Sequence, residues 1–211
     1  MAVPTHQEND IRIDDLEVAA RAAIEANQRI VTFVATMGTT DAFGVDDLES
    51  IVHLRDRLVE EYSLDYAPHV HADAVIGWAW SVFNDYDFEQ NALEFRPRTV
   101  RALAAACRRI SKLSLADSIG IDFHKTGFAP YISSLFLARR REDMERLVRG
   151  RQTMPYLFQS GERHPGVYTL ETSRSGSGVL AAYANLQLFG KAGLRTLLGH
   201  LVEMAESLRE H

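Results

Sequence analysis

One lysine stands in surroundings that suit chemistry. Lys125 lies between apolar runs, in Ile121-Asp122-Phe123-His124-Lys125-Thr126-Gly127, in a chain that otherwise prefers arginine. Partial burial disfavours an ammonium group, so a lysine in such a place can supply a free amine that forms a Schiff base with a carbonyl compound. The alternative is a solvated lysine on a turn, which is the commoner situation for this residue type.

A second candidate is the carboxylate of Asp73, which stands among small and apolar residues in His71-Ala72-Asp73-Ala74-Val75. A poorly solvated carboxylate needs a cationic partner. The protonated ring nitrogen of a pyridine cofactor would be such a partner, and its protonation makes the ring a stronger electron sink. Asp73 would otherwise cap the next helix or bond to its own turn.

The same stretch also allows a metal site. His69, His71 and Asp73 spell H-x-H-x-D, and in a strand all three side chains would point to one face, as a metal-dependent hydrolase would require. A second ligand cluster is harder to find, because the other candidate histidines stand in unrelated settings: His124, His164 and His200. A histidine packed near a strand start is the simpler interpretation of His69.

Hydrophobic periodicity predicts an α/β fold with a mostly parallel sheet flanked by helices. We expect strands at 30–35, 68–72, 118–122 and 131–138. We expect helices at 13–24, 48–59, 99–113, 177–188 and 192–208, and a loop at 150–172. Because ligands gather at the carboxyl ends of parallel strands, the polar residues that follow these strands are expected to converge on one crevice. These are Thr39 and Thr40, His71 and Asp73, and His124 and Lys125.

Composition argues for one soluble domain. The 211 residues are 46% hydrophobic and 25% charged, and the net charge of −6 comes from interspersed acids and bases, so neither nucleic acid nor an anionic membrane is expected as a partner. The single cysteine, Cys107, cannot form an internal disulfide and is expected to be a packed side chain. Acidic residues near the start argue against a signal peptide, and no apolar run is long enough to span a membrane. We expect a cytoplasmic protein.

Four segments in a fixed order resemble the group II pyridoxal-phosphate-dependent amino-acid decarboxylases, the family of the glutamate, aspartate, aromatic-amino-acid and tyrosine enzymes. The first two resemble its A-T-x-G-T-T turn and its H-V-D-A-A cofactor motif, and the others its A-D-S…H-K signature and its S-R-x-G segment. In this chain they are Val34–Thr40, His71–Ala74, Ala116–Ser118 with His124-Lys125, and Glu171–Gly176. The amino-acid sequence around Lys125 and Arg174 is most similar to that of the bacterial aspartate or glutamate decarboxylase branch.

The resemblance implies the large domain of the fold-type I pyridoxal-phosphate enzymes. It implies that residues 1–211 are the central and C-terminal part of that domain, without the N-terminal segment and the small C-terminal domain of the complete enzyme. The implied reaction is the release of carbon dioxide from Cα of an L-amino acid, aspartate, glutamate or a related one. A chain that keeps the motifs without a complete site is the alternative.

Site roles follow from the same resemblance. Lys125 would bind the aldehyde of pyridoxal 5'-phosphate as a Schiff base, and Asp73 would keep the ring nitrogen protonated. The residues implied to contact the cofactor or its phosphate are His124, Ser118, Thr39 and Thr40, each of which can also be an ordinary turn or cap residue.

Two further roles involve the later part of the chain. The family places a serine at the phosphate of the neighbouring subunit of a homodimer, and Ser173 matches it. In the family, a tyrosine on a loop after the lysine is the usual donor of the proton that returns to Cα, and both Tyr156 and Tyr168 lie in the corresponding stretch of this chain. A tyrosine packed at the base of the loop is the alternative for either.

Overall fold

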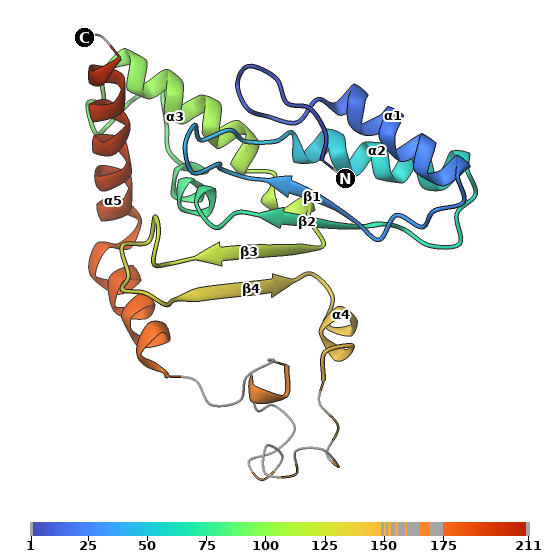
Figure 1. Ribbon diagram of the computed structural model, residues 1–211. Coiled ribbons are helices and arrows are strands. Elements are labelled where there is room, and N and C mark those ends of the chain that lie inside the picture. Colours follow the sequence, from blue (N-terminus) through green and yellow to red (C-terminus); the bar gives the residue numbers. More distant parts are fainter. Residues whose placement is uncertain are drawn as a thin grey trace.

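A four-stranded sheet organises the computed structural model, which describes residues 2–148, 150, 152, 155, 159, 165–168 and 175–209. The strand order is β1-β2-β3-β4, as Figure 1 shows. β1 (Thr32–Thr36), β2 (His69–Asp73) and β3 (Ser118–Asp122) are parallel, and β4 (Ser134–Ala138) pairs with β3 in the antiparallel direction. The predicted α/β class with a mostly parallel sheet is confirmed.

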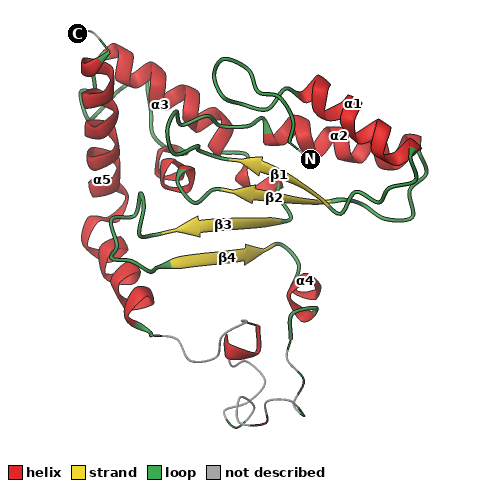
Figure 2. Ribbon diagram, in the orientation of Figure 1, coloured by secondary structure: helices red, strands yellow, loops and turns green. Residues whose placement is uncertain are grey.

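Helices connect the parallel strands, as crossovers between parallel strands require. α1 (Ile13–Glu25) precedes β1, α2 (Leu48–Glu61) joins β1 to β2, and η1 (Gly77–Phe83) with α3 (Pro97–Ile110) joins β2 to β3. The remaining helices are η2 (Leu113–Leu115), α4 (Arg141–Glu145), η4 (Pro165–Tyr168) and α5 (Ser177–Leu208). Figure 2 shows α1, α2 and α3 on the β1 side of the sheet and α5 across the carboxyl ends of β1, β2 and β3. No helix in the described part of the chain has the length and apolar character needed to cross a membrane.

The two faces of the sheet differ in burial. On β1 and β2, every second side chain enters the hydrophobic core, where Phe33, Ala35, Val70 and Ala72 meet residues of the helices. The intervening side chains lie on the opposite face, called here the His71 face. By strand register it carries Thr32, Val34, Thr36, His69, His71, Asp73, Ser118, Gly120, Asp122, Ser134, Phe136 and Ala138. Val34 and Phe136 are about half exposed on it, at 52% and 51%.

Most predicted strands and helices are confirmed, with corrections. The helices α4 and η2 were not predicted, and η4 lies within the predicted loop at 150–172. The last strand begins at Ser134 and not at Tyr131, because the N–H of Ser133 donates to the side chain of His124 and leaves the ladder. The short helix η1 was not predicted, since its sequence Gly-Trp-Ala-Trp-Ser-Val-Phe lacks a polar face. The break predicted near residue 190 is present as a kink within α5, where Gly190 has a φ of 56°. Cys107 is buried, as expected, and burial raises the pKa of its thiol.

Candidate active site

The carboxyl ends of β2 and β3 bring the predicted site residues onto one face of the sheet. Asp73 pairs in register with Thr36 on one side and Gly120 on the other. Cross-strand partners point to the same face, and residues two apart along a strand share a face. Asp73, Ser118, Gly120 and Asp122 therefore all belong to the His71 face.

Lys125 lies in the turn that follows β3. Its backbone N–H donates to the carbonyl of Asp122 at 3.4 Å, and its Nζ lies 3.0 Å from Oδ2 of the same residue. Because Asp122 belongs to the His71 face, the amine is held on the face that carries Asp73. Lys125 and Asp73 therefore lie on the same face of the sheet, as one shared cofactor ring would require. A placement on opposite faces would have contradicted such a ring.

Sequence reasoning did not single out Asp122, which holds both members of the His124-Lys125 pair. Its Oδ2 lies 3.4 Å from Nε2 of His124, and its Oδ1 accepts a hydrogen bond of 2.6 Å from Ser134 Oγ. Burial opposes ionisation of Asp122, but the hydrogen bonds from Ser134 and Lys125 outweigh it and lower the pKa of the carboxyl. Its position could have indicated this role, because Asp122 ends a predicted strand and lies three residues before the lysine.

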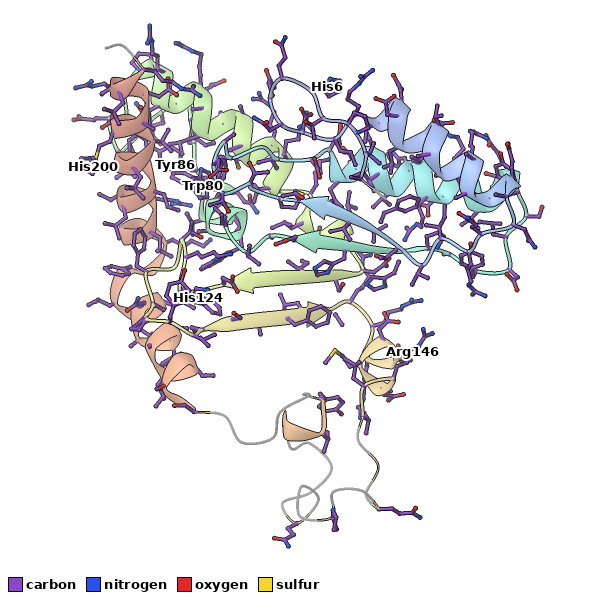
Figure 3. The ribbon with its side chains drawn as sticks, in the orientation of Figure 1. His6, Trp80, Tyr86, His124, Arg146 and His200 are labelled. Carbon is purple, nitrogen blue, oxygen red and sulfur yellow. The ribbon has the colours of Figure 1, made fainter. Side chains whose placement is uncertain are left out.

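His124 is fixed on three sides. Nδ1 lies 3.1 Å from the backbone nitrogen of Ser133 and 2.9 Å from its carbonyl oxygen, and Nε2 faces Asp122. The ring of Tyr131, a residue that the sequence did not point to, lies 4.0 Å from the imidazole between centroids. Figure 3 labels His124 at the carboxyl end of β3, close to α5. His124 thus belongs to the same cluster as Lys125.

Asp73 is half-buried at the end of β2. Its Oδ1 accepts a long contact of 3.4 Å from the N–H of Val75, and within the described residues no lysine or arginine forms an ion pair with it. The carboxylate keeps capacity to accept a hydrogen bond from a cationic donor on the His71 face. A protonated ring nitrogen is a donor of that kind.

The two histidines of β2 bind one hydroxyl. Ser118 Oγ lies 2.8 Å from His69 Nε2 and 2.8 Å from His71 Nδ1. A hydroxyl donates at most one hydrogen bond, so at least one of these two nitrogens donates its proton to Ser118 Oγ. Burial lowers the pKa of His71, although the charge of Asp73 opposes this shift.

This arrangement bears on two hypotheses. The metal site at His69, His71 and Asp73 gains no support, because the described residues contain no group of three ligands placed to hold a metal ion. Figure 3 shows His200 on α5, away from His124 at the end of β3, so these two histidines do not form a second ligand cluster. Ser118 is buried and its hydroxyl is already bound by two imidazoles, so its contact with a cofactor phosphate stays a prediction.

The threonines after β1 occupy a turn. The Oγ1 of Thr39 accepts a hydrogen bond of 2.8 Å from the N–H of Gly44, and Thr40 is exposed. Gly38 has a φ of 121°, which favours glycine, and packs against the backbone of Gly77. Thr39 therefore stabilises the turn, and the cofactor contacts of both threonines stay predictions.

Asp117, the acid of the A-D-S segment, has a structural place. Its Oδ2 accepts hydrogen bonds of 3.0 Å from Arg55 on α2 and 2.9 Å from the backbone N–H of Val70. It therefore joins the start of β3 to β2 and α2, away from the carboxyl ends where Lys125 lies.

Three predicted residues lie in the later segment. Tyr168 ends η4 and is half-buried. Tyr156 and Ser173 lie outside the described residues. The roles predicted for these side chains are not tested by the geometry.

Comparison with known proteins decides the family. The model of the pyridoxal-dependent decarboxylase conserved domain matches residues 1–211. The chain belongs to this family. Among curated relatives, it is 28% identical over its full length to an L-tyrosine decarboxylase of Enterococcus faecium, and 26% identical over 97% of its length to an aspartate 1-decarboxylase of Aliivibrio fischeri. The chain spans 36% and 32% of these two proteins, about a third of their length.

Solved structures agree on the fold. Mouse CSAD has a TM-score of 0.72 at 19% identity, with the match covering 100% of this chain and 38% of that one. A glutamate decarboxylase of Lactobacillus brevis has a TM-score of 0.60 at 19% identity over 92% of this chain and 36% of that one. The family resemblance is confirmed by the family model over residues 1–211. The assignment to the aspartate or glutamate branch stays open, because tyrosine and aspartate decarboxylases match at similar identity.

The residues present fit the cofactor that gives the family its name. An amine, a carboxylate with acceptor capacity left and an imidazole occupy one end of one face, and Gly120 lies between Asp73 and Asp122 without a side chain. An aldehyde, a ring nitrogen and a phosphate are the groups that these three side chains would bind. Lys125, Asp73 and His124 are the residues that would hold it.

Proposed function

We propose that this chain carries the lysine-bearing part of the active site of a pyridoxal-phosphate-dependent amino-acid decarboxylase. The observation that carries the proposal is that Lys125 and Asp73 share one face at one end of a parallel sheet. Parallel α/β sheets bind ligands at this end of their strands. The family match supports the same chemistry.

In this proposal each side chain has a separate task. Lys125 offers its amine to the cofactor aldehyde, and Asp73 accepts a hydrogen bond from the protonated ring nitrogen. His124, held by Ser133 and Asp122, faces the phosphate. When bound, pyridoxal phosphate supplies an electron sink for the bond that breaks at Cα of the substrate.

The later segment contributes the remaining tasks. Tyr156 or Tyr168 donates the proton that returns to Cα from its phenol oxygen, and Ser173 contacts the phosphate held by the neighbouring subunit of a homodimer. Outside this segment, Thr39 and Thr40, which directly follow Gly38 in the turn after β1, contact the cofactor. The substrate is an L-amino acid, aspartate, glutamate or tyrosine, as the names of the relatives indicate for those proteins.

The first experiment tests cofactor attachment. Pyridoxal phosphate added to the purified chain should give an absorbance band near the edge of the visible range, and borohydride should fix the label on Lys125. Lys125→Ala should abolish the band, and Asp73→Asn should weaken binding, whereas Lys191→Ala on α5 should leave both unchanged. A band that persists in Lys125→Ala would refute the assignment.

A second experiment tests the reaction. Carbon dioxide release should be measured with aspartate, glutamate and tyrosine in separate assays. We expect release from one of them, and Lys125→Ala should reduce it to background. Labelling of Lys125 without release from any amino acid would favour a protein that keeps the cofactor site without the reaction.

A further inference from the structure

Each of the three lysines of the chain is held by a carboxylate. Lys112 Nζ lies 2.8 Å from Glu49, Lys191 Nζ lies 2.8 Å from Asp85, and Lys125 Nζ lies 3.0 Å from Asp122. The first two pairs are solvent-exposed, whereas the side chain of Asp122 is only 14% exposed. Exposed ion pairs restrain their side chains little, so the third pair is the one that can define a position.

Asp122 also gathers two neighbours in sequence. Lys125 Nζ and His124 Nε2 both face the same oxygen, Oδ2, at 3.0 Å and 3.4 Å. A shared carboxylate oxygen keeps the amine and the imidazole together on the His71 face.

The carboxylate is itself fixed. Asp122 pairs in register with Ser134 on β4, whose hydroxyl donates to Oδ1 at 2.6 Å. The indole N–H of Trp78 on η1 donates to the backbone carbonyl of Asp122 at 3.1 Å. Groups from η1 and β4 and the following turn therefore all hold this one residue, which gives the long, flexible side chain of Lys125 a rigid reference point.

We propose that Asp122 is a positioning residue that aims the Lys125 amine at the cofactor site and keeps His124 beside it. The inference rests on the proposed function, in which Lys125 is the point of attachment. Reaction between an amine and an aldehyde is fastest when the two are held in the right geometry, so a lysine without this anchor should attach the cofactor more slowly.

The test compares two aldehydes on one chain. Pyridoxal phosphate and formaldehyde are each added with cyanoborohydride, and modification at the three lysines is quantified by peptide mass spectrometry. In both reactions the amine nitrogen bonds to the aldehyde carbon with loss of water, and the reductant supplies hydride. Pyridoxal phosphate needs a built site, whereas formaldehyde needs only an accessible amine.

The informative variant is Asp122→Asn, which keeps size and removes charge. It should slow pyridoxal phosphate modification of Lys125 about tenfold relative to the other two lysines, while its formaldehyde modification does not fall. Asp85→Asn is the matched control, because it removes the carboxylate that pairs with Lys191 and should leave Lys125 unchanged. Ser134→Ala, which frees Asp122 on one side, should slow modification by a smaller factor and serves if Asp122→Asn does not fold.

The outcomes are distinguishable. Pyridoxal phosphate modification of Asp122→Asn at the wild-type rate, or faster, overturns the positioning role. Equal loss with both aldehydes overturns it too, since that pattern reports a disturbed fold. If wild-type Lys125 reacts with pyridoxal phosphate no faster than Lys112 and Lys191, the proposed function fails first, and the positioning role falls with it.

Discussion

The backbone of Gly77 packs directly against the carbonyl oxygen of Met37. A Cβ placed on Gly77 would lie 1.8 Å from that oxygen, closer than any real contact allows. Met37 follows β1 and Gly77 follows β2, so this contact joins the two turns at the carboxyl ends of neighbouring strands. The position of the turn beside Asp73 depends on the absence of a side chain at residue 77.

Gly77→Ala should therefore displace the backbone and lower the free energy of unfolding by about 1–3 kcal/mol, as overpacking in a tight site does. Urea denaturation followed by circular dichroism measures the change. Gly120→Ala is the control, because a Cβ there meets its nearest atom, His71 Nε2, at an ordinary distance of 3.7 Å. Equal stability of Gly77→Ala and wild type would show that the two turns are not in contact.

Asp117→Ala should destabilise the protein by about 2–4 kcal/mol, because it leaves the buried N–H of Val70 and the guanidinium of Arg55 without this acceptor. Arg55 also offers the control. Its second carboxylate partner, Asp56, is 60% exposed, so Asp56→Ala should cost less than about 1 kcal/mol. Chemical denaturation of both variants gives the difference, and similar costs would contradict a structural role for the A-D-S acid.

The pH dependence of stability should contain a contribution from His71. Burial lowers the pKa of its imidazole, so the unfolded chain takes up this proton before the folded chain does. The stability that the neutral ring provides is complete above its unfolded pKa of about 6.5 and is lost as the pH falls below it. His71→Asn should reduce the loss of stability between pH 7.5 and pH 5.

The measurement for His71 is urea denaturation at these two pH values. His200→Asn is the control, because His200 is exposed on α5 and should not alter the slope. An unchanged pH slope in His71→Asn would mean that another group is responsible.

Trp78→Phe should lower stability by about 1–2 kcal/mol more than Trp80→Phe. Both changes remove part of a buried indole. Trp78→Phe also removes the hydrogen bond that the indole N–H donates to the carbonyl of Asp122, and the described residues show no such bond from Trp80. Trp80 packs its ring on Phe43 at 4.1 Å. Thermal unfolding of the two variants compares them, and a larger cost for Trp80→Phe would count against the Trp78 bond as an anchor of the lysine turn.

The sequence alone determined the order of the strands and long helices and the class of the fold. Apolar runs of strand length, such as the one that contains Phe33 and Ala35, predict strands, and apolar residues at helical spacing predict the helices between them. It also determined the family, since motif spacing around Asp73 and Lys125 is a property of the chain itself. Local patterns of this kind are set by short-range physical chemistry.

Tertiary structure decided what these residues contact. The use of Ser118 by two histidines, the direction of β4 and the capture of Lys125 by Asp122 all depend on strand order and register. Strand order and register follow from packing between segments far apart in the chain, which no local pattern records. The same is true of Asp117, a residue of the A-D-S segment whose partners Arg55 and Val70 make it a structural anchor.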